Sequence, residues 1–236
     1  MATALPKPDS LRFVLPEQWV QITPDRENLD RHHQQILTNI ADAGLTISKT
    51  EQRKLEVSFA QMRAGMLAHG ISSLSVFADA FPSGEGVEGE DDETVIAMAT
   101  CTMMSHSQET LGTHLSLRPE LLATVFSLDR RPEDAVDERS RNTAIEPPEV
   151  VELPVGKVLV LKNLVEHTET IANVHKIFAQ SFLIPHDETY QSLTAVQFNT
   201  PNLDLAKDFS RLFDKIATTF ALLRADDPSI PGEADN

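Results

Sequence analysis

The stretch that decides the fold reads IFAQSFLIP over residues 177–185, YQSLTAVQF over residues 190–198 and TPNLDLAKDFSRLFDKIATTF over residues 200–220. The first two segments are rich in strand-forming residues and are bounded by proline, which predicts two paired strands. The third predicts a helix over 201–223, because its large apolar side chains share one face. These are Leu205, Phe209, Leu212, Phe213, Ile216 and Phe220. A helix with such a face is not stable alone in water, so we expect it to cover a sheet.

The N-terminal part of the chain predicts two further helices. Helical patterns between Pro24 and Gly70 are separated by about six residues, which predicts an antiparallel helical hairpin. Ser48 and Glu51 have the spacing of a capping box at the start of the second helix. The remaining patterns predict strands over 11–22, 71–81, 94–104, 150–153 and 158–164 and a short helix over 117–128.

Strands joined as hairpins, with helices segregated from them, predict an α+β fold. We expect a mainly antiparallel sheet of about seven strands covered by helices as an α/β/α-type sandwich, with the helical hairpin near the N-terminus. A single domain should span residues 11–223, with flexible tails over 1–10 and 224–236. The charged loop over 129–148 is long for a compact domain, and an internal boundary would fall there.

The charge balance limits the partners. Lys and Arg total 20 against 36 Asp and Glu, a net charge of −16. Nonspecific binding to nucleic acid or to anionic lipid rests on cationic side chains, so we expect neither as a partner. The natural complement is a basic or neutral protein, whereas acidity that serves solubility alone is the alternative.

An acidic loop over 82–93 is the candidate contact surface for such a partner. Its carboxylates are Glu85, Glu88, Glu90, Asp91, Asp92 and Glu93. They do not alternate as calcium ligands do in an EF-hand loop, so a solvated loop is the alternative interpretation. Gly84, Gly86 and Gly89 precede a strand, not a helix, which argues against a phosphate-binding loop.

Candidate chemistry is sparse, and we predict neither a cofactor nor a metal. His32 and His33 are helix neighbours that point about 100° apart, and His167 and His175 could meet across two strands but have few further ligands nearby. Ser105-His106-Ser107 lacks the third group that orients a catalytic base. Cys101, the only cysteine, lies in an apolar strand and is expected to be a buried small side chain. The N-terminus lacks the apolar core of a signal peptide, so we expect a cytoplasmic protein.

Phe13, Leu15, Pro16 and Trp19 form a Phe-x-Leu-Pro-x-x-Trp entry strand. Together with the helical insert, the antiparallel sheet and a closing helix after Thr200-Pro201, this pattern resembles the Mog1/PsbP-like fold over roughly residues 11–223. The hairpin over 151–161 resembles that of uncharacterised actinobacterial members of the fold. The resemblance implies a non-enzymatic accessory subunit, a binder of small GTPases or a lipoprotein binding module. It transfers no functional residue, because the matching positions are structural.

These observations predict a non-enzymatic protein-binding module that acts as an adaptor or accessory subunit of a larger assembly. An immunity or chaperone-like protein that masks a basic toxin or a secreted client is the alternative. A hydrolase with an unrecognised site is the second alternative, and it would require a triad or metal set that the sequence does not display.

Overall fold

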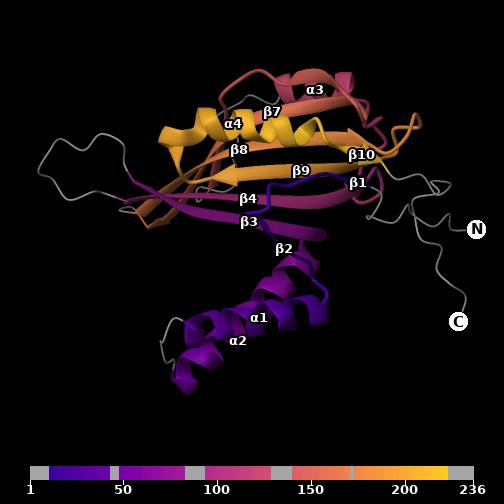
Figure 1. The fold of residues 1–236 in the computed structure, drawn as a ribbon. Helices are drawn as coiled ribbons and strands as arrows, with labels where there is room; N and C mark the ends of the chain where they lie inside the picture. The colour runs from indigo at the N-terminus through magenta and orange to yellow at the C-terminus, as the bar shows by residue number, and fades with distance from the viewer. Residues whose placement is uncertain (1–10, 43–47, 83–93, 129–139, 171–172, 223–236) are drawn as a thin grey trace, which may run out of the picture.

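The computed structural model describes residues 11–42, 48–82, 94–128, 140–170 and 173–222, and these form an α+β fold (Figure 1). The strands are β1 Leu11–Arg12, β2 Val20–Ile22, β3 Ile71–Pro82, β4 Thr94–Ser107, β5 Ser140–Ala144, β6 Glu149–Leu153, β7 Gly156–Thr170, β8 Asn173–Pro185, β9 Ser192–Thr200 and β10 Ala221–Leu222. The helices are α1 Arg26–Asp42, α2 Lys49–Ala68, α3 Pro119–Leu128 and α4 Ala206–Ala217, with a 3-10 turn η2 at Leu203–Leu205.

Eight of these strands form one antiparallel sheet. Its order is β2-β3-β4-β9-β8-β7-β5, and β6 pairs with the first part of β7. β1 and β10 form a separate two-stranded pair. The predicted α+β class with a mainly antiparallel sheet is confirmed. Strands from both sides of residues 129–148 belong to the same sheet, because β9 lies between β4 and β8.

Helix α4 lies over β8 and β9 and covers one face of the sheet (Figure 1). Phe209 and Phe213 are 6% and 0% exposed, so the predicted role of this helix as the sheet cover is confirmed. The Phe213 ring stacks on Phe198 of β9 with the ring centroids 4.6 Å apart. The core beneath α4 also contains Phe178 and Phe182 of β8.

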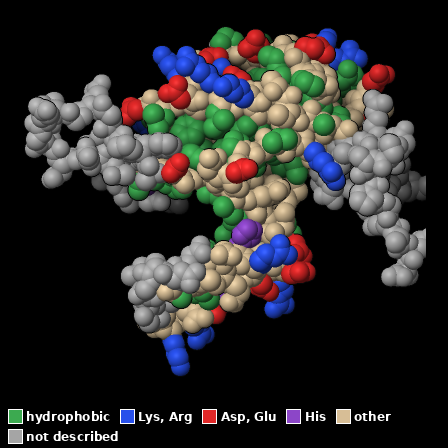
Figure 2. Space-filling view, in the orientation of Figure 1, with side chains coloured by type: hydrophobic (Ala, Val, Ile, Leu, Met, Phe, Trp, Pro, Cys, Tyr) green, Lys and Arg blue, Asp and Glu red, His purple; other side chains and the backbone are tan. Residues whose placement is uncertain are grey.

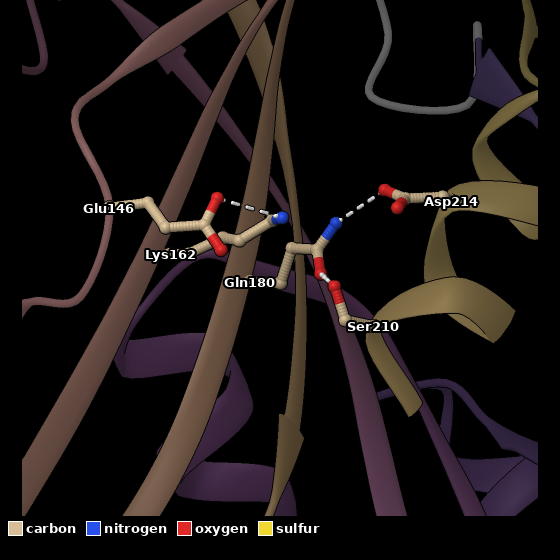
Figure 3. A network of polar contacts seen from close by, with 5 residues as sticks. All are labelled: Glu146, Lys162, Gln180, Ser210 and Asp214. Atoms are coloured by element: carbon tan, nitrogen blue, oxygen red, sulfur yellow. Dashed lines mark hydrogen bonds and ion pairs between the residues drawn. The ribbon is translucent and has the colours of Figure 1, made fainter. Parts of the chain in front are cut away.

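A buried amide fixes α4 in its position on the sheet (Figure 3). Gln180 of β8 is fully buried beneath the helix. Its Nε2 donates to Asp214 Oδ1 at 2.7 Å, and its Oε1 accepts from Ser210 Oγ at 2.8 Å. A buried amide without partners would cost the full desolvation of its polar atoms, so this geometry selects one placement of α4.

The predicted bounds of the last helix are wrong. The segment starts as the 3-10 turn η2, and α4 ends at Ala217, so Phe220 lies beyond it. Phe220 still joins the same core, where its ring meets Phe182 at 5.5 Å and Phe13 at 5.4 Å. The apolar spacing of the sequence continues past the end of the helix. The reason is that the chain turns at Thr218 and Thr219, and this turn keeps Phe220 on the same core.

The predicted strands need two more corrections. Residues 11–22 form two short strands, β1 and β2, not one. The predicted loop over 129–148 contains β5, which pairs with β7 from Ser140↔His167 to Ala144↔Asn163. The β5 sequence SRNTA lacks the apolar alternation of a half-buried strand, so its ladder with β7 and not its own pattern defines it.

Helices α1 and α2 pack against each other and against β2 at one edge of the sheet. Leu29 and Phe59 are buried on Ile22, and Figure 2 shows that the two helices project from the rest of the described chain. The capping box is confirmed, since Ser48 N donates to Glu51 Oε2 at 2.7 Å and Glu51 N donates to Ser48 Oγ at 3.2 Å. The first of these bonds is the main cause that lowers the pKa of Glu51.

In the described residues, no helix combines the length and apolar character required to cross a membrane. Several predictions concern residues outside the described ranges: the tails over 1–10 and 224–236, the three glycines and the acidic residues of 83–93, and the greater part of the charged segment over 129–148.

Candidate binding face

We call the face of the sheet opposite α4 the open face. Its side chains follow from the strand register, which places Asn199 of β9 beside Thr100 of β4 and Ala179 of β8. Two rows cross the sheet on this face: Ala144, Asn163, Ala179, Asn199, Thr100 and Val76, and then Leu161, Ser181, Gln197, Thr102 and Leu74. The α4 face carries a phenylalanine-rich core, whereas the centre of the open face is small and polar.

The open face is partly covered at one end by the α3 region. Leu117 and Leu122 pack against Leu193 and Ala195, which alternate with the α4-facing residues of β9. At the β2 edge, Ile22 continues the row of Leu74 and supports the α1–α2 pair. The remaining width of the open face has no helix above it among the described residues.

Hydrogen bonds hold the polar centre of the open face in one arrangement. Gln197 Nε2 donates to Asn199 Oδ1 at 2.8 Å, and Asn199 Nδ2 donates to Thr100 Oγ1 at 3.4 Å. Thr102 Oγ1 donates to the main-chain oxygen of Gln197 at 3.4 Å. These side chains are therefore ordered before any partner binds, which lowers the entropy that association must offset.

Exposed apolar side chains border this polar centre. Ile96 and Met98 of β4 lie on the open face and are 59% and 43% exposed. The prediction that these two side chains share one face of the strand with Thr100 is confirmed. That face is the open face, which points away from the α4 core. On α3, Leu121, Val125 and Leu128 form an exposed stripe at helical spacing, because only the other side of this helix meets the sheet.

A groove of about 370 Å³ lies on the open face between α3 and β5. Phe126 of α3 lines it from one side and Asn142 of β5 from another, above a floor that includes Asn163, Ser181 and Gln197. Lys162 also borders the groove, but it is the register partner of Gln180, so its side chain points to the α4 face, where it forms an ion pair of 3.0 Å with Glu146 (Figure 3). The groove thus combines apolar walls with uncharged polar side chains.

The structure separates the Ser105-His106-Ser107 cluster. Ser105 and Ser107 lie on the α4 face, where Ser105 Oγ is 3.4 Å from Thr194 Oγ1 and Ser107 bonds to Thr110. His106 alternates to the other face, and burial lowers its pKa. Cys101 is buried as predicted, and burial raises the pKa of its thiol, so this sulfur is a poor nucleophile.

The structure also contains a contact between a histidine and two hydroxyl side chains that was not predicted from the sequence. His186 Nε2 lies 2.7 Å from Thr194 Oγ1, and His186 Nδ1 lies 3.0 Å from Ser192 Oγ. Both ring nitrogens are thereby engaged, and Thr194 is fully buried where no substrate can reach it. The sequence did contain a pattern that could have predicted this contact. Ser192 and Thr194 are two residues apart in a strand, which puts both hydroxyls on one face, and His186 precedes them across the β8–β9 turn.

The two histidine pairs are positioned as their sequence spacing predicts. His32 Nε2 contacts the main-chain oxygen of Gln21 at 2.9 Å, whereas the His33 ring faces Phe59 at 5.5 Å, so the two diverge. His167 and His175 are register partners on β7 and β8. Within the described ranges, no group of three or more His, Cys, Asp or Glu side chains is placed to hold a metal ion.

The scan against protein-family models found no matching family, and the search of curated proteins found no match. The six acidic residues predicted to contact a partner, Glu85, Glu88, Glu90, Asp91, Asp92 and Glu93, lie outside the described residues. The open face is therefore the candidate site that rests on described geometry.

Proposed function

We propose that this chain is a non-enzymatic protein-binding module, an adaptor or accessory subunit of a larger assembly, and that a partner protein covers its open face. The observation that carries the proposal is the exposure of Ile96 and Met98 on that face, beside a polar centre already ordered by hydrogen bonds. Apolar side chains that are grouped on an otherwise polar face gain free energy when a partner removes them from water.

The chemistry of the partner follows from the charge. With a net charge of −16, the chain attracts a basic or neutral protein and repels polyanions. The acidic run over 85–93 leads in sequence directly into β4 and ends three positions before Ile96. We propose that these carboxylates steer the partner toward the open face, and that the apolar residues hold it there.

The Mog1/PsbP-like assignment, the helical hairpin over α1 and α2 and a cytoplasmic location belong to the same proposal. Support for the fold assignment comes from the entry segment with the buried Trp19 and from a closing helix after Thr200-Pro201. Support for the location comes from the single free cysteine, Cys101, which suits a compartment in which disulfides are not needed.

Site-specific photo-crosslinking in the source cell tests the proposal. A photoreactive residue at Met98 or Val125 should capture a discrete protein partner, whereas the matched position Lys207, exposed on the outer side of α4, should not. The variant Met98→Glu should then weaken binding of the captured partner while leaving the thermal unfolding temperature unchanged. Capture from Lys207 but not from Met98 or Val125 would place the interface elsewhere and contradict the proposal.

A further inference from the structure

The groove beside α3 offers hydrogen-bonding capacity that the described fold does not use. Among the described residues, no hydrogen bond involves the side chains of Asn142, Asn163 or Ser181. Gln197 uses its Nε2 for Asn199 and leaves its carboxamide oxygen available. Phe126 stands at the side of the groove with 41% of its surface exposed.

The side chains that line the groove disfavour a charged ligand. Lys162 points to the α4 face and pairs there with Glu146 at 3.0 Å, so the polar side chains that the strands turn toward the groove are amides and a hydroxyl. A charge brought into such a groove would lose hydration without meeting an opposite charge. A ligand with neutral donors and acceptors together with an apolar group satisfies both kinds of wall.

The protein itself contains an example of what a carboxamide does beside an extended chain. Asn202 Oδ1 accepts from the main-chain nitrogen of Met98, and Asn202 Nδ2 donates to the main-chain oxygen of Ile96, both at 2.8 Å. These two main-chain groups lie two residues apart on the same edge of strand β4. One carboxamide thus matches the donor and acceptor spacing of an extended main chain.

We propose that the groove binds an extended, uncharged peptide segment of the partner protein. The carboxamides of Asn142, Asn163 and Gln197 bond to the main chain of the segment, and one apolar side chain of the segment packs against Phe126. A groove of about 370 Å³ lies at the lower end of the range for ligand pockets, so it accommodates one anchoring side chain with its flanking main chain. This inference rests on the proposed function and specifies the part of the partner that is recognised.

The test uses a phage-displayed library of random peptides selected on the full-length protein. Peptides recovered should be rich in uncharged residues around an apolar anchor. Their affinity for Asn163→Asp and Gln197→Glu should fall by about tenfold, since both changes keep the shape and add a charge, while the first removes a free donor and the second breaks the bond that orders Gln197 on Asn199. Gln191→Glu, an exposed amide outside the groove, is the matched control and should bind like the wild type. Thermal unfolding of each variant checks that the fold is kept.

Several outcomes would overturn the inference. One is a selection in which no recovered peptide depends on Asn163 or Gln197. Another is a set of basic peptides that bind all variants equally and weaken with salt, because those would use the acidic surface. Self-association that Asn163→Asp abolishes would assign the groove to a second copy of the chain. If Met98 still captures a partner protein when the peptide test fails, the proposed function stands and only this inference falls. If both fail, both are wrong.

Discussion

The side chain of Asn202 replaces a strand beside β4, because its carboxamide pairs with the main chain of both Ile96 and Met98 at 2.8 Å. Strand β9 ends at Thr200, and its last register pair with β4 is Asn199 with Thr100. Thr200 Oγ1 donates to the Met98 oxygen at 2.7 Å and extends the same bridging. The ladder is thus continued by side chains where the partner strand has turned away toward α4.

Asn202→Ala should lower the free energy of unfolding by about 1–3 kcal/mol, because two main-chain groups lose their partner. Asn202→Asp keeps the acceptor for Met98 N but cannot donate to the Ile96 oxygen while it is ionised. Its deficit against the wild type should therefore shrink as the pH falls through the pKa of the new carboxyl group. Urea unfolding measures both effects, and Asn142→Ala, an exposed amide, is the control. Equal stability of Asn202→Ala and the wild type would show that the bridge contributes nothing.

Gln180 and Ser210 should be energetically coupled, because the Gln180 oxygen accepts from Ser210 Oγ inside the core (Figure 3). Gln180→Leu and Ser210→Ala should each destabilise the protein, and the double variant should lose less than the sum. We expect a coupling free energy of roughly 0.5–3 kcal/mol from a double-mutant cycle in denaturant. Strict additivity would mean that the two side chains act independently in placing α4.

Phe213→Ala should cost about 3–5 kcal/mol, since the ring is fully buried and stacked on Phe198. Leu203→Ala, at an exposed apolar position in η2, is the matched control and should change stability little. Chemical denaturation with a constant dependence on denaturant concentration provides the comparison. A smaller loss of stability for Phe213→Ala than for Leu203→Ala would show that the packing of α4 does not stabilise the core.

His186 should make the protein less stable in mild acid. Burial lowers the pKa of this histidine below its ordinary value, although the Asp187 carboxylate opposes the effect. The unfolded chain therefore takes up the proton at higher pH than the folded one. The free energy that neutral His186 contributes to stability is fully present above its pKa of about 6.5 in the unfolded chain. It is lost as the pH falls through its lower pKa in the folded protein. Thermal unfolding from neutral pH down to mild acid should show a flatter dependence for His186→Gln than for the wild type. His114→Gln, at an exposed position, is the control and should follow the wild-type curve.

Features with a strong local pattern could be predicted from the sequence. The α4 stripe, the buried Cys101 and the Ser48–Glu51 capping box depend on residues a few positions apart, so their spacing carries the information. The common face of Ile96, Met98 and Thr100 followed from alternation. Alternation does not show which face a helix covers, so the exposure of Ile96 and Met98 could not be predicted.

Features that depend on distant residues could not be predicted. β5 is polar and gains its strand conformation from pairing with β7. The Asn202 bridge joins residues 104 and 106 positions apart, and the Gln180 contact joins residues 34 apart. The groove contains residues of α3, β5, β7, β8 and β9, which only the strand order brings together.

The place of β9 between β4 and β8 has a consequence for synthesis of the chain. Thr102 and its neighbour Gln197 are 95 residues apart, so a ribosome adding 5–20 residues per second needs roughly 5–20 s between them. During that interval β3 and β4 can form their hairpin, but the inner edge of β4 has no strand to pair with. An unpaired edge is a template for other nascent chains. Polysomes that carry this message should therefore depend on co-translational chaperones, and chains released before residue 192 should aggregate.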